Sequence, residues 1–155
     1  MGTVVVGVDG SPGARRALAW AVDEARLRGC SLRVVHAWMV PLIDAMPEPW
    51  AIGSPPIGPS DDDVYEHLVA GAKGVLDEAL DEARAWAPEL EIEGELVEAR
   101  AAGALIAEAR DADLLVVGSR GRGGFGGLLL GSVSAQCVHH ASCPVVVVPP
   151  DRGEG

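Results

Sequence analysis

Apolar runs and amphipathic stretches alternate along the chain, and this alternation predicts strands and helices in turn. The runs Thr3–Val8 and Leu114–Val117 contain several β-branched residues and are typical of strands buried on both faces of a parallel sheet. Residues 31–36 predict a shorter strand, and residues 91–98 alternate between apolar and acidic positions, as a half-exposed edge strand does. A fifth strand is predicted over Pro144–Val148, which contains four consecutive valines.

The stretches between these strands have apolar residues at helical spacing. The first helix is predicted to begin with Ser11 as its cap and Pro12 in its first turn, and to end at Gly29. Its inward face would consist of Leu18, Ala21, Val22 and Ala25.

Three further helices are predicted in the rest of the chain. The second runs from Asp61 to just before Pro88, with an apolar stripe that extends to Trp86. A short helix follows over residues 102–110, and the last one opens at Ser132. Five strands that alternate with four helices predict a doubly wound α/β fold, in which an open parallel five-stranded sheet carries helices on both faces.

Residues 39–60 show neither helical nor strand periodicity and contain six of the 11 prolines. Connections of this length inside compact domains tend to be functional lids or poorly ordered segments, and both interpretations stay open. Neither makes the segment a domain boundary. We therefore expect a single domain over residues 1–150, with this proline-rich loop inserted in it, and a short tail at 151–155.

Composition and charge indicate which binding partners and which cellular compartment are to be expected. The formal net charge of −11 repels polyanions, which argues against nonspecific nucleic-acid binding and against attraction to an anionic membrane. The chain enters a strand at once, and no apolar run approaches about 18 residues, the length of a membrane span. The three cysteines are an odd number and fit a reducing compartment. We therefore expect a cytoplasmic protein that neither crosses a membrane nor binds nucleic acid.

The segment Gly118–Gly131 is the strongest functional signal, because seven of its fourteen positions are glycine. Glycines let the backbone turn tightly and let a ligand approach closely. Arg120 and Arg122 lie in this segment, and the helix that opens at Ser132 directs its free N–H groups and positive dipole end toward it. These features predict a phosphate site. In a doubly wound sheet it would lie where the strand order reverses; if the first and fourth strands are neighbours there, residues 7–11 share the same crevice.

Two familiar phosphate-binding motifs fit this segment poorly. Residues 121–126 match GxGxxG, but five residues separate them from the helix, whereas the dinucleotide motif runs directly from strand into helix. A Walker loop would require a lysine after its last glycine, and Ser132 follows Gly131 directly. The spacing that does match is Gly118-x2-Gly121-x9-Gly131-Ser132.

That spacing resembles the nucleotide-binding signature of the universal stress protein family. The similarity extends over nearly the whole chain, through VVVGVDGS at the start, VVHAW, ADLLVVGSRGRGG and the closing GSVSAQCVHHASCPVVVVP. The resemblance implies strand order 3-2-1-4-5 and ATP as the ligand, with Mg²⁺ as a possible counter-ion. It places Gly7, Val8 and Ala37 near the adenine, Val117 and Gly118 along the ribose, Asp9 at the ribose or phosphate end, and Arg120, Gly121, Gly131, Ser132, Val133 and Ser134 around the phosphates.

Several of these residues have plainer interpretations as well. Asp9 could simply cap the first helix, and His36 is expected to be a core or crevice-wall residue. Consecutive carboxylates at 61–63 are typical of a solvated helix start rather than of a metal site. The group formed by Cys137, His139, His140 and Cys143 lacks the spacing that would place its members on one helix face, so we expect no metal there.

Two functions of different classes remain open. The first is an ATP-binding stress or signalling module with slow or no ATP hydrolysis, because no general base other than Asp9 is evident and no catalytic set can be assembled. The second is a homodimeric interaction domain in which the nucleotide crevice is vestigial. In either case the apolar edge strand around Val145–Val148 predicts a homodimer by antiparallel pairing, which the family resemblance also implies.

Overall fold

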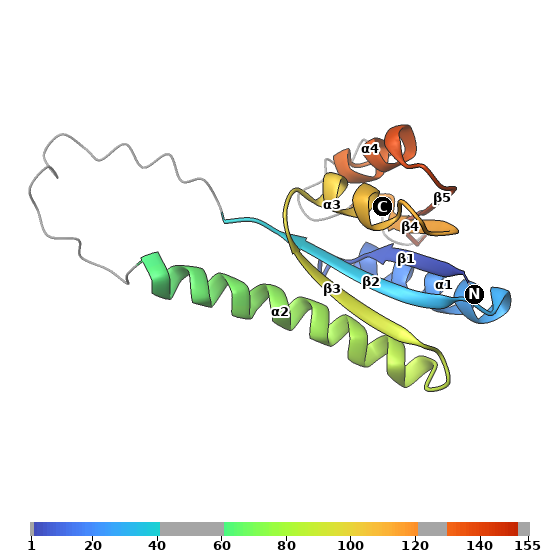
Figure 1. Cartoon of the computed structure of the whole chain (residues 1–155), viewed down its shortest axis with the longest axis horizontal. Helices are drawn as coiled ribbons and strands as arrows, with labels where there is room; N and C mark the ends of the chain where they lie inside the picture. Colours follow the sequence, from blue (N-terminus) through green and yellow to red (C-terminus); the bar gives the residue numbers. More distant parts are fainter. Residues whose placement is uncertain (1, 41–60, 121–129, 152–155) are drawn as a thin grey trace, which may run out of the picture.

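The computed structural model describes residues 2–40, 61–120 and 130–151 (Figure 1). Strands and helices alternate throughout this part of the chain. In order they are β1 (Thr3–Gly7), α1 (Pro12–Arg28), β2 (Ser31–Trp38), α2 (Asp61–Trp86), β3 (Ile92–Glu98), α3 (Ala101–Glu108), β4 (Leu114–Gly118), α4 (Ser132–His140) and β5 (Val145–Val148). Most of the proline-rich segment, residues 41–60, lies outside the described residues, and so does the end of the tail, residues 152–155.

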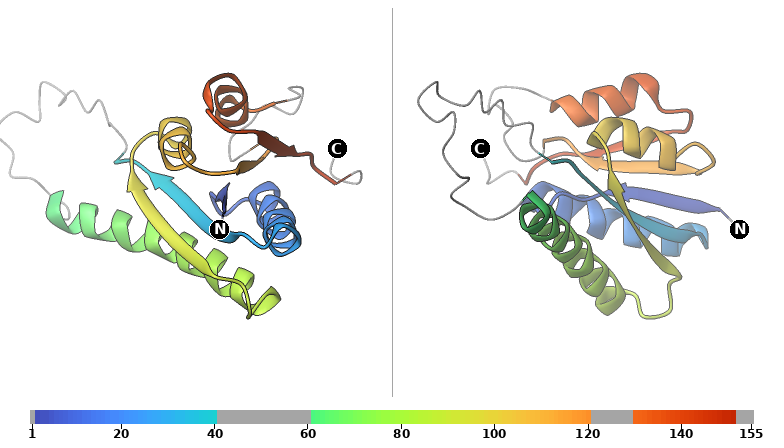
Figure 2. Two further views of the ribbon diagram at one scale, coloured as in Figure 1. Left: turned by 45° about the vertical axis from the view of Figure 1, so that its right-hand side comes forward. Right: turned by 60° about the vertical axis from the view of Figure 1, so that its left-hand side comes forward.

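The strands form one parallel sheet of order β3-β2-β1-β4-β5. This confirms the predicted doubly wound α/β fold and its strand order. Helices α1 and α2 cover one face of the sheet, whereas α3 and α4 cover the other (Figures 1 and 2). The order reverses between β1 and β4, because β2 and β3 follow on one side of β1 and β4 and β5 on the other.

Strand β1 supplies side chains to both hydrophobic cores. Val4, Val5 and Val6 are fully buried. Since successive residues of a strand point to opposite faces, Val4 and Val6 pack in the core under α1 and α2, and Val5 packs in the core under α3 and α4. This double burial explains why the sequence of β1 is apolar at consecutive positions.

Helix α1 has both of the predicted end signals. The Ser11 hydroxyl accepts a hydrogen bond from the Ala14 N–H at 3.2 Å, and Pro12 occupies the first turn. At the other end Gly29 adopts a left-handed conformation, with φ of 67°, which stops the helix. The predicted bounds of α1 are therefore confirmed.

The structure corrects the prediction for Trp86. Its side chain is 38% exposed, and the Arg15 guanidinium lies 5.8 Å from the centre of its ring. Leu76 and Ala83 of the same predicted stripe are buried as expected. Leu80 is buried with them, since spacings of four and three residues keep all three on one face of α2. Trp86 lies to the side of this face, where it contacts α1 through Arg15.

Two element ends differ by two residues from those predicted, whereas the other predicted ends differ by at most one. Strand β2 continues beyond residue 36 to Trp38, because Ala37 and Trp38 pair with Val97 and Glu98 of β3. Helix α3 ends at Glu108, two residues earlier than predicted. The β2 extension carries Ala37 into the sheet two positions beyond Val35, which pairs with Gly7 at the end of β1.

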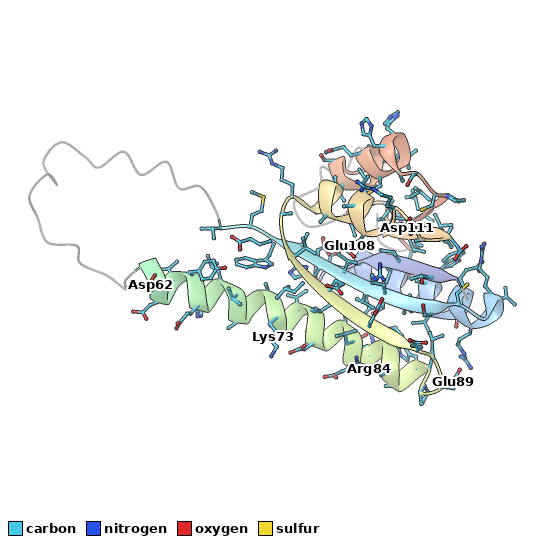
Figure 3. All side chains as sticks on the ribbon, viewed as in Figure 1. Asp62, Lys73, Arg84, Glu89, Glu108 and Asp111 are labelled. Carbon is cyan, nitrogen blue, oxygen red and sulfur yellow. The ribbon has the colours of Figure 1, made fainter. Side chains whose placement is uncertain are left out.

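The outer face of α2 is charged. Lys73 points away from the sheet, whereas the apolar residues of the helix point toward it (Figure 3). Arg84 is also exposed, but its guanidinium reaches the edge of the sheet, where it lies 3.5 Å from the Ile92 carbonyl oxygen of β3. Among residues 2–40, 61–120 and 130–151, no helix is long and apolar enough to cross a lipid bilayer.

The first turn of α1 packs directly against the end of β4. A Cβ atom added to Gly118 would lie 3.1 Å from the carbonyl carbon and oxygen of Gly13, and one added to Gly13 would lie 2.9 Å from the Arg120 carbonyl oxygen. Because these contacts are with backbone atoms, no rotamer change can relieve them. The start of α1 and the chain after β4 are thus in backbone contact that leaves no room for a side chain at Gly13 and little room for one at Gly118.

We expect Gly13→Ala to lower the free energy of unfolding by about 1–3 kcal/mol, since its methyl group would displace the Arg120 carbonyl. Gly74→Ala is the matched control. A Cβ atom at Gly74 meets nothing within 4 Å, so the helix preference of alanine should stabilise the protein by about 0.5–1 kcal/mol. Urea unfolding of the two variants measures both effects. A Gly13→Ala variant as stable as the Gly74→Ala variant would show that the backbone contact is loose.

Candidate functional site

The candidate site lies at the carboxyl ends of β1 and β4, where the strand order reverses. The two strands are direct neighbours, with Val6 opposite Val116, so the loops that follow them begin side by side. The first loop leads to α1 on one face and the second leads to α4 on the other. The sequence-predicted residues lie at this edge or just beyond it. They are Gly7 at the end of β1 with Val8 and Asp9 after it, Ala37 near the end of β2, Val117 and Gly118 at the end of β4 with Arg120 after it, and Gly131, Ser132, Val133 and Ser134 at the start of α4. Gly121 lies outside the described residues.

The turn between β1 and α1 is held by local hydrogen bonds. The Val8 N–H donates to the Val35 carbonyl oxygen at 2.9 Å, which continues the sheet by one residue. One carboxylate oxygen of Asp9 accepts from the Ser11 N–H at 2.9 Å. Ser11, not Asp9, is the cap of α1. Asp9 therefore shapes the turn that precedes the helix, and this local role does not require a ligand.

The two ends of the glycine-rich segment are joined to each other. The Ser119 carbonyl oxygen accepts from the Gly131 N–H at 2.6 Å and from the Ser134 hydroxyl at 2.9 Å. We call this pair of hydrogen bonds the Ser119 clasp. The Ser119 N–H in turn donates to the Val148 carbonyl oxygen at 2.9 Å, which connects the clasp to β5.

The side chain of Ser134 serves the clasp. It is 2% exposed, and its hydroxyl also lies 3.1 Å from the Gly131 carbonyl oxygen. The sequence placed Ser134 among the phosphate-contacting residues, but its hydroxyl is directed at two protein carbonyls. Any contact of Ser134 with a ligand would therefore involve its backbone N–H rather than its side chain.

The start of α4 has the geometry of an anion-binding helix end. Gly131 is the N-terminal cap in an extended conformation, and the first backbone hydrogen bond of the helix runs from the Ala135 N–H to the Gly131 carbonyl oxygen at 3.0 Å. The N–H groups of Ser132, Val133 and Ser134 precede that bond and so have no partner within the helix. The first turn contains no acidic residue. Its positive dipole end is therefore not neutralised by a carboxylate of its own.

Sequence reasoning missed the role of Ser119, and it identified His36 as a core or crevice-wall residue without finding its hydrogen-bond partner. Ser119 acts mainly through its backbone, so its residue type carries little signal beyond its place directly after a strand. His36 is buried, and its Nδ1 lies 2.8 Å from the Val8 carbonyl oxygen. A polar residue inside the apolar run VVHAW was a usable signal, because buried polar groups need hydrogen-bond partners.

The cysteines near α4 belong to the core. Cys137 is fully buried, and Cys143 packs against the same cluster. Burial raises the pKa of both thiols, so they stay protonated at neutral pH and act as apolar groups. Within the part of the chain that the structure describes, no group of three or more histidine, cysteine or acidic side chains is arranged to hold a metal ion.

Comparison with known proteins agrees with this architecture. A universal stress protein of Mycolicibacterium smegmatis is 39% identical over 148 residues, which are 95% of this chain and 45% of that protein. The chain thus spans about half the length of the curated relatives that it matches.

Solved structures of similar proteins share the fold. UspA from Lactobacillus plantarum superposes with a TM-score of 0.74 at 20% identity, over 95% of this chain and 97% of that one. A universal stress protein in complex with cAMP gives 0.68 at 31% identity, over 95% and 96%. The universal stress protein from Archaeoglobus fulgidus in complex with dAMP gives 0.64 at 27% identity, over 96% and 98%.

The family comparison covers almost the entire sequence. Residues 1–149 match the sequence model of the universal stress protein family. The strand order and the placement of the glycine-rich segment before α4 agree with that match. The chain therefore belongs to the universal stress protein family.

Proposed function

We propose that the protein binds ATP at the carboxyl ends of β1 and β4 and works as a nucleotide-dependent stress or signalling module. The observation that carries this proposal is the free N-terminus of α4, held by the Ser119 clasp at the edge where the β1–α1 turn also begins. Relatives solved with cAMP and with dAMP support an adenine nucleotide as the ligand class.

The described residues suggest how each part of ATP would be bound. The N–H groups at the start of α4 would donate to phosphate oxygens, and the positive charge of Arg120 would favour the same group. Gly7, Val8 and Ala37 would border the adenine, and Val117 and Gly118 the ribose. Mg²⁺ would accompany the phosphates as a counter-ion, which suits a protein whose net charge is −11.

We expect hydrolysis of ATP to be slow or absent. Asp9 was the candidate general base in the sequence, and one of its carboxylate oxygens is already engaged with the Ser11 N–H. A base that is held in a turn is poorly placed to activate water unless the turn rearranges. The output of binding would then be a change of shape or partner. Three cysteines that are free thiols suit the reducing cytoplasm as the place of action.

The module would act as a homodimer. β5 pairs with β4 along one edge, and its four valines are half-buried in the single chain. Antiparallel pairing of β5 with its copy in a second subunit would bury more of this apolar edge, and Pro149 and Pro150 would limit the pairing to a short segment.

Gly131→Val tests the phosphate end of the site. The extended backbone at Gly131 accepts a branched residue, so the fold should be retained, but the side chain would block the approach of a phosphate to α4. We expect isothermal titration calorimetry to show at least tenfold weaker ATP binding than for the wild type. Gly74→Ala on α2 is the control, with unchanged affinity. Wild-type affinity in a folded Gly131→Val variant would refute the proposed phosphate position.

Arg120→Ala should weaken ATP binding by roughly three- to tenfold and leave adenosine binding unchanged. The charge of Arg120 would act on the phosphates, and salt screens such an interaction on a half-exposed loop. The difference between wild type and variant should therefore shrink as salt is raised from 50 to about 500 mM. Equal losses for ATP and adenosine would move Arg120 away from the phosphate end.

Val147→Lys and Val146→Lys should each convert the dimer to a monomer, because a charge on either face of β5 opposes burial of that edge. Light scattering coupled to size exclusion at micromolar concentration measures the mass. Val138→Lys on α4 is an exposed control that should remain dimeric. A monomeric wild type, or dimeric β5 variants, would contradict pairing through this strand.

A further inference from the structure

His36 is a polar side chain placed in the buried end of β2. It is 9% exposed, and its Nδ1 lies 2.8 Å from the carbonyl oxygen of Val8. A carbonyl oxygen can only accept a hydrogen bond, so Nδ1 must carry the proton. The neutral ring is then the Nδ1–H tautomer, and a protonated ring would keep the same donor in place.

This hydrogen bond completes the attachment of Val8 to β2. Val8 lies one residue beyond β1, where its N–H donates to the Val35 carbonyl oxygen at 2.9 Å. Its carbonyl oxygen accepts a hydrogen bond from the side chain of His36, which follows Val35 on β2. Both peptide groups of Val8 are thereby fixed, and a buried carbonyl is not left without a donor.

The fixed peptide is the base of the β1–α1 turn. The Asp9 carboxylate accepts from the Ser11 N–H at 2.9 Å, and the Ser11 hydroxyl then accepts from the Ala14 N–H at 3.2 Å. These bonds are local, so they set the shape of the turn but not its position on the sheet. At its β1 end the position of the turn is set by Val8, which is bound to β2 through Val35 and His36, and at its α1 end by the backbone contact of Gly13 with the chain after β4.

We propose that His36 is a positioning residue of the nucleotide site, which holds Val8 and Asp9 in the place where they contact the ligand. The proposal rests on the proposed ATP-binding function, because Val8 borders the adenine in it and Asp9 is expected at the ribose or phosphate end. Without the imidazole donor, the Val8 carbonyl would turn toward another donor such as water, and the turn would move with it. His36 touches no ligand in this scheme and acts only through Val8.

Three substitutions separate positioning from general packing. In His36→Asn the amide nitrogen is attached to Cγ, as Nδ1 is in histidine, so the donor is kept near its place. His36→Gln moves the donor one methylene further out, and His36→Leu removes it. We expect calorimetry to show wild-type ATP affinity within about threefold for the asparagine variant and about tenfold weaker binding for the other two. If His36→Leu fails to fold, His36→Gln carries the comparison.

Leu32→Val, in the other half of β2, is the control for stability alone. It removes apolar volume from the same strand and should lower the melting temperature without changing ATP affinity. An equal loss of affinity in this variant would overturn the positioning role, as would equal affinity in wild type, leucine and glutamine variants. NMR of the imidazole nitrogens gives an independent readout: the Nδ1–H tautomer is expected, and the Nε2–H tautomer would overturn the bond to Val8.

The same measurements distinguish this inference from the function on which it rests. A wild type that binds ATP while all His36 variants bind equally well would refute positioning and leave the ATP site standing. A wild type that binds neither ATP nor adenosine would refute the proposed function, and the positioning role with it.

Discussion

The parallel pairing of β1 with β4 is the contact on which the rest of the molecule depends. It joins Val4, Val5 and Val6 to Leu114, Leu115 and Val116, and all six side chains are buried. The chain leaves β1 toward one face and β4 toward the other, so this pairing also fixes where the helix layers separate. The backbone contact between Gly13 and the end of β4 reinforces it from the α1 side. A buried interaction thus sets the geometry of an exposed site.

Charge has a different role in the site than in the chain as a whole. The net charge of −11 would repel a free nucleotide at long range, but at physiological salt the Debye length is about 8 Å, so most of that charge is screened. What decides binding is the local field within the last few ångströms. There the start of α4 contributes backbone dipoles rather than side-chain charges, and its first turn has no acidic residue to oppose them. An acidic protein can therefore hold a polyanionic ligand at one point.

Much of the fold was predictable because a strand that is buried on both faces of a sheet has apolar residues at consecutive positions of its sequence. The runs that became β1 and β4 contain consecutive buried apolar residues, and the ends of α1 are marked by Ser11 and Gly29. The prediction for Trp86 was wrong because it relied on residue type and approximate helical spacing. On the helix the position of Trp86 is rotated to the side of the buried face. The extension of β2 to Trp38 depends on its pairing with β3, and the local sequence pattern carries no information on which strands pair.

The site was predictable in outline but not in its hydrogen bonds. Glycine spacing indicated the loop and the helix that follows it, whereas the roles of Ser119 and Ser134 depend on backbone carbonyls that no residue type reveals. His36 was noticed as a buried polar residue, yet its partner is the Val8 carbonyl, 28 positions away. To predict contacts of this kind, one needs the strand register as well as the pattern of apolar and polar residues.

Because the Ser119 clasp joins residues 119 and 131, the ends of the glycine-rich segment are held together by atoms that flank its middle. Closing a longer loop between fixed ends costs only about 0.6 kcal/mol for each doubling of its length. The clasp thus ties the end of β4 to the start of α4 through described residues alone, so the entropy of closing the segment between them would change little with its length. A change in the length of that segment would therefore leave the packing of both hydrophobic cores unaltered, because neither core contains any of its described residues.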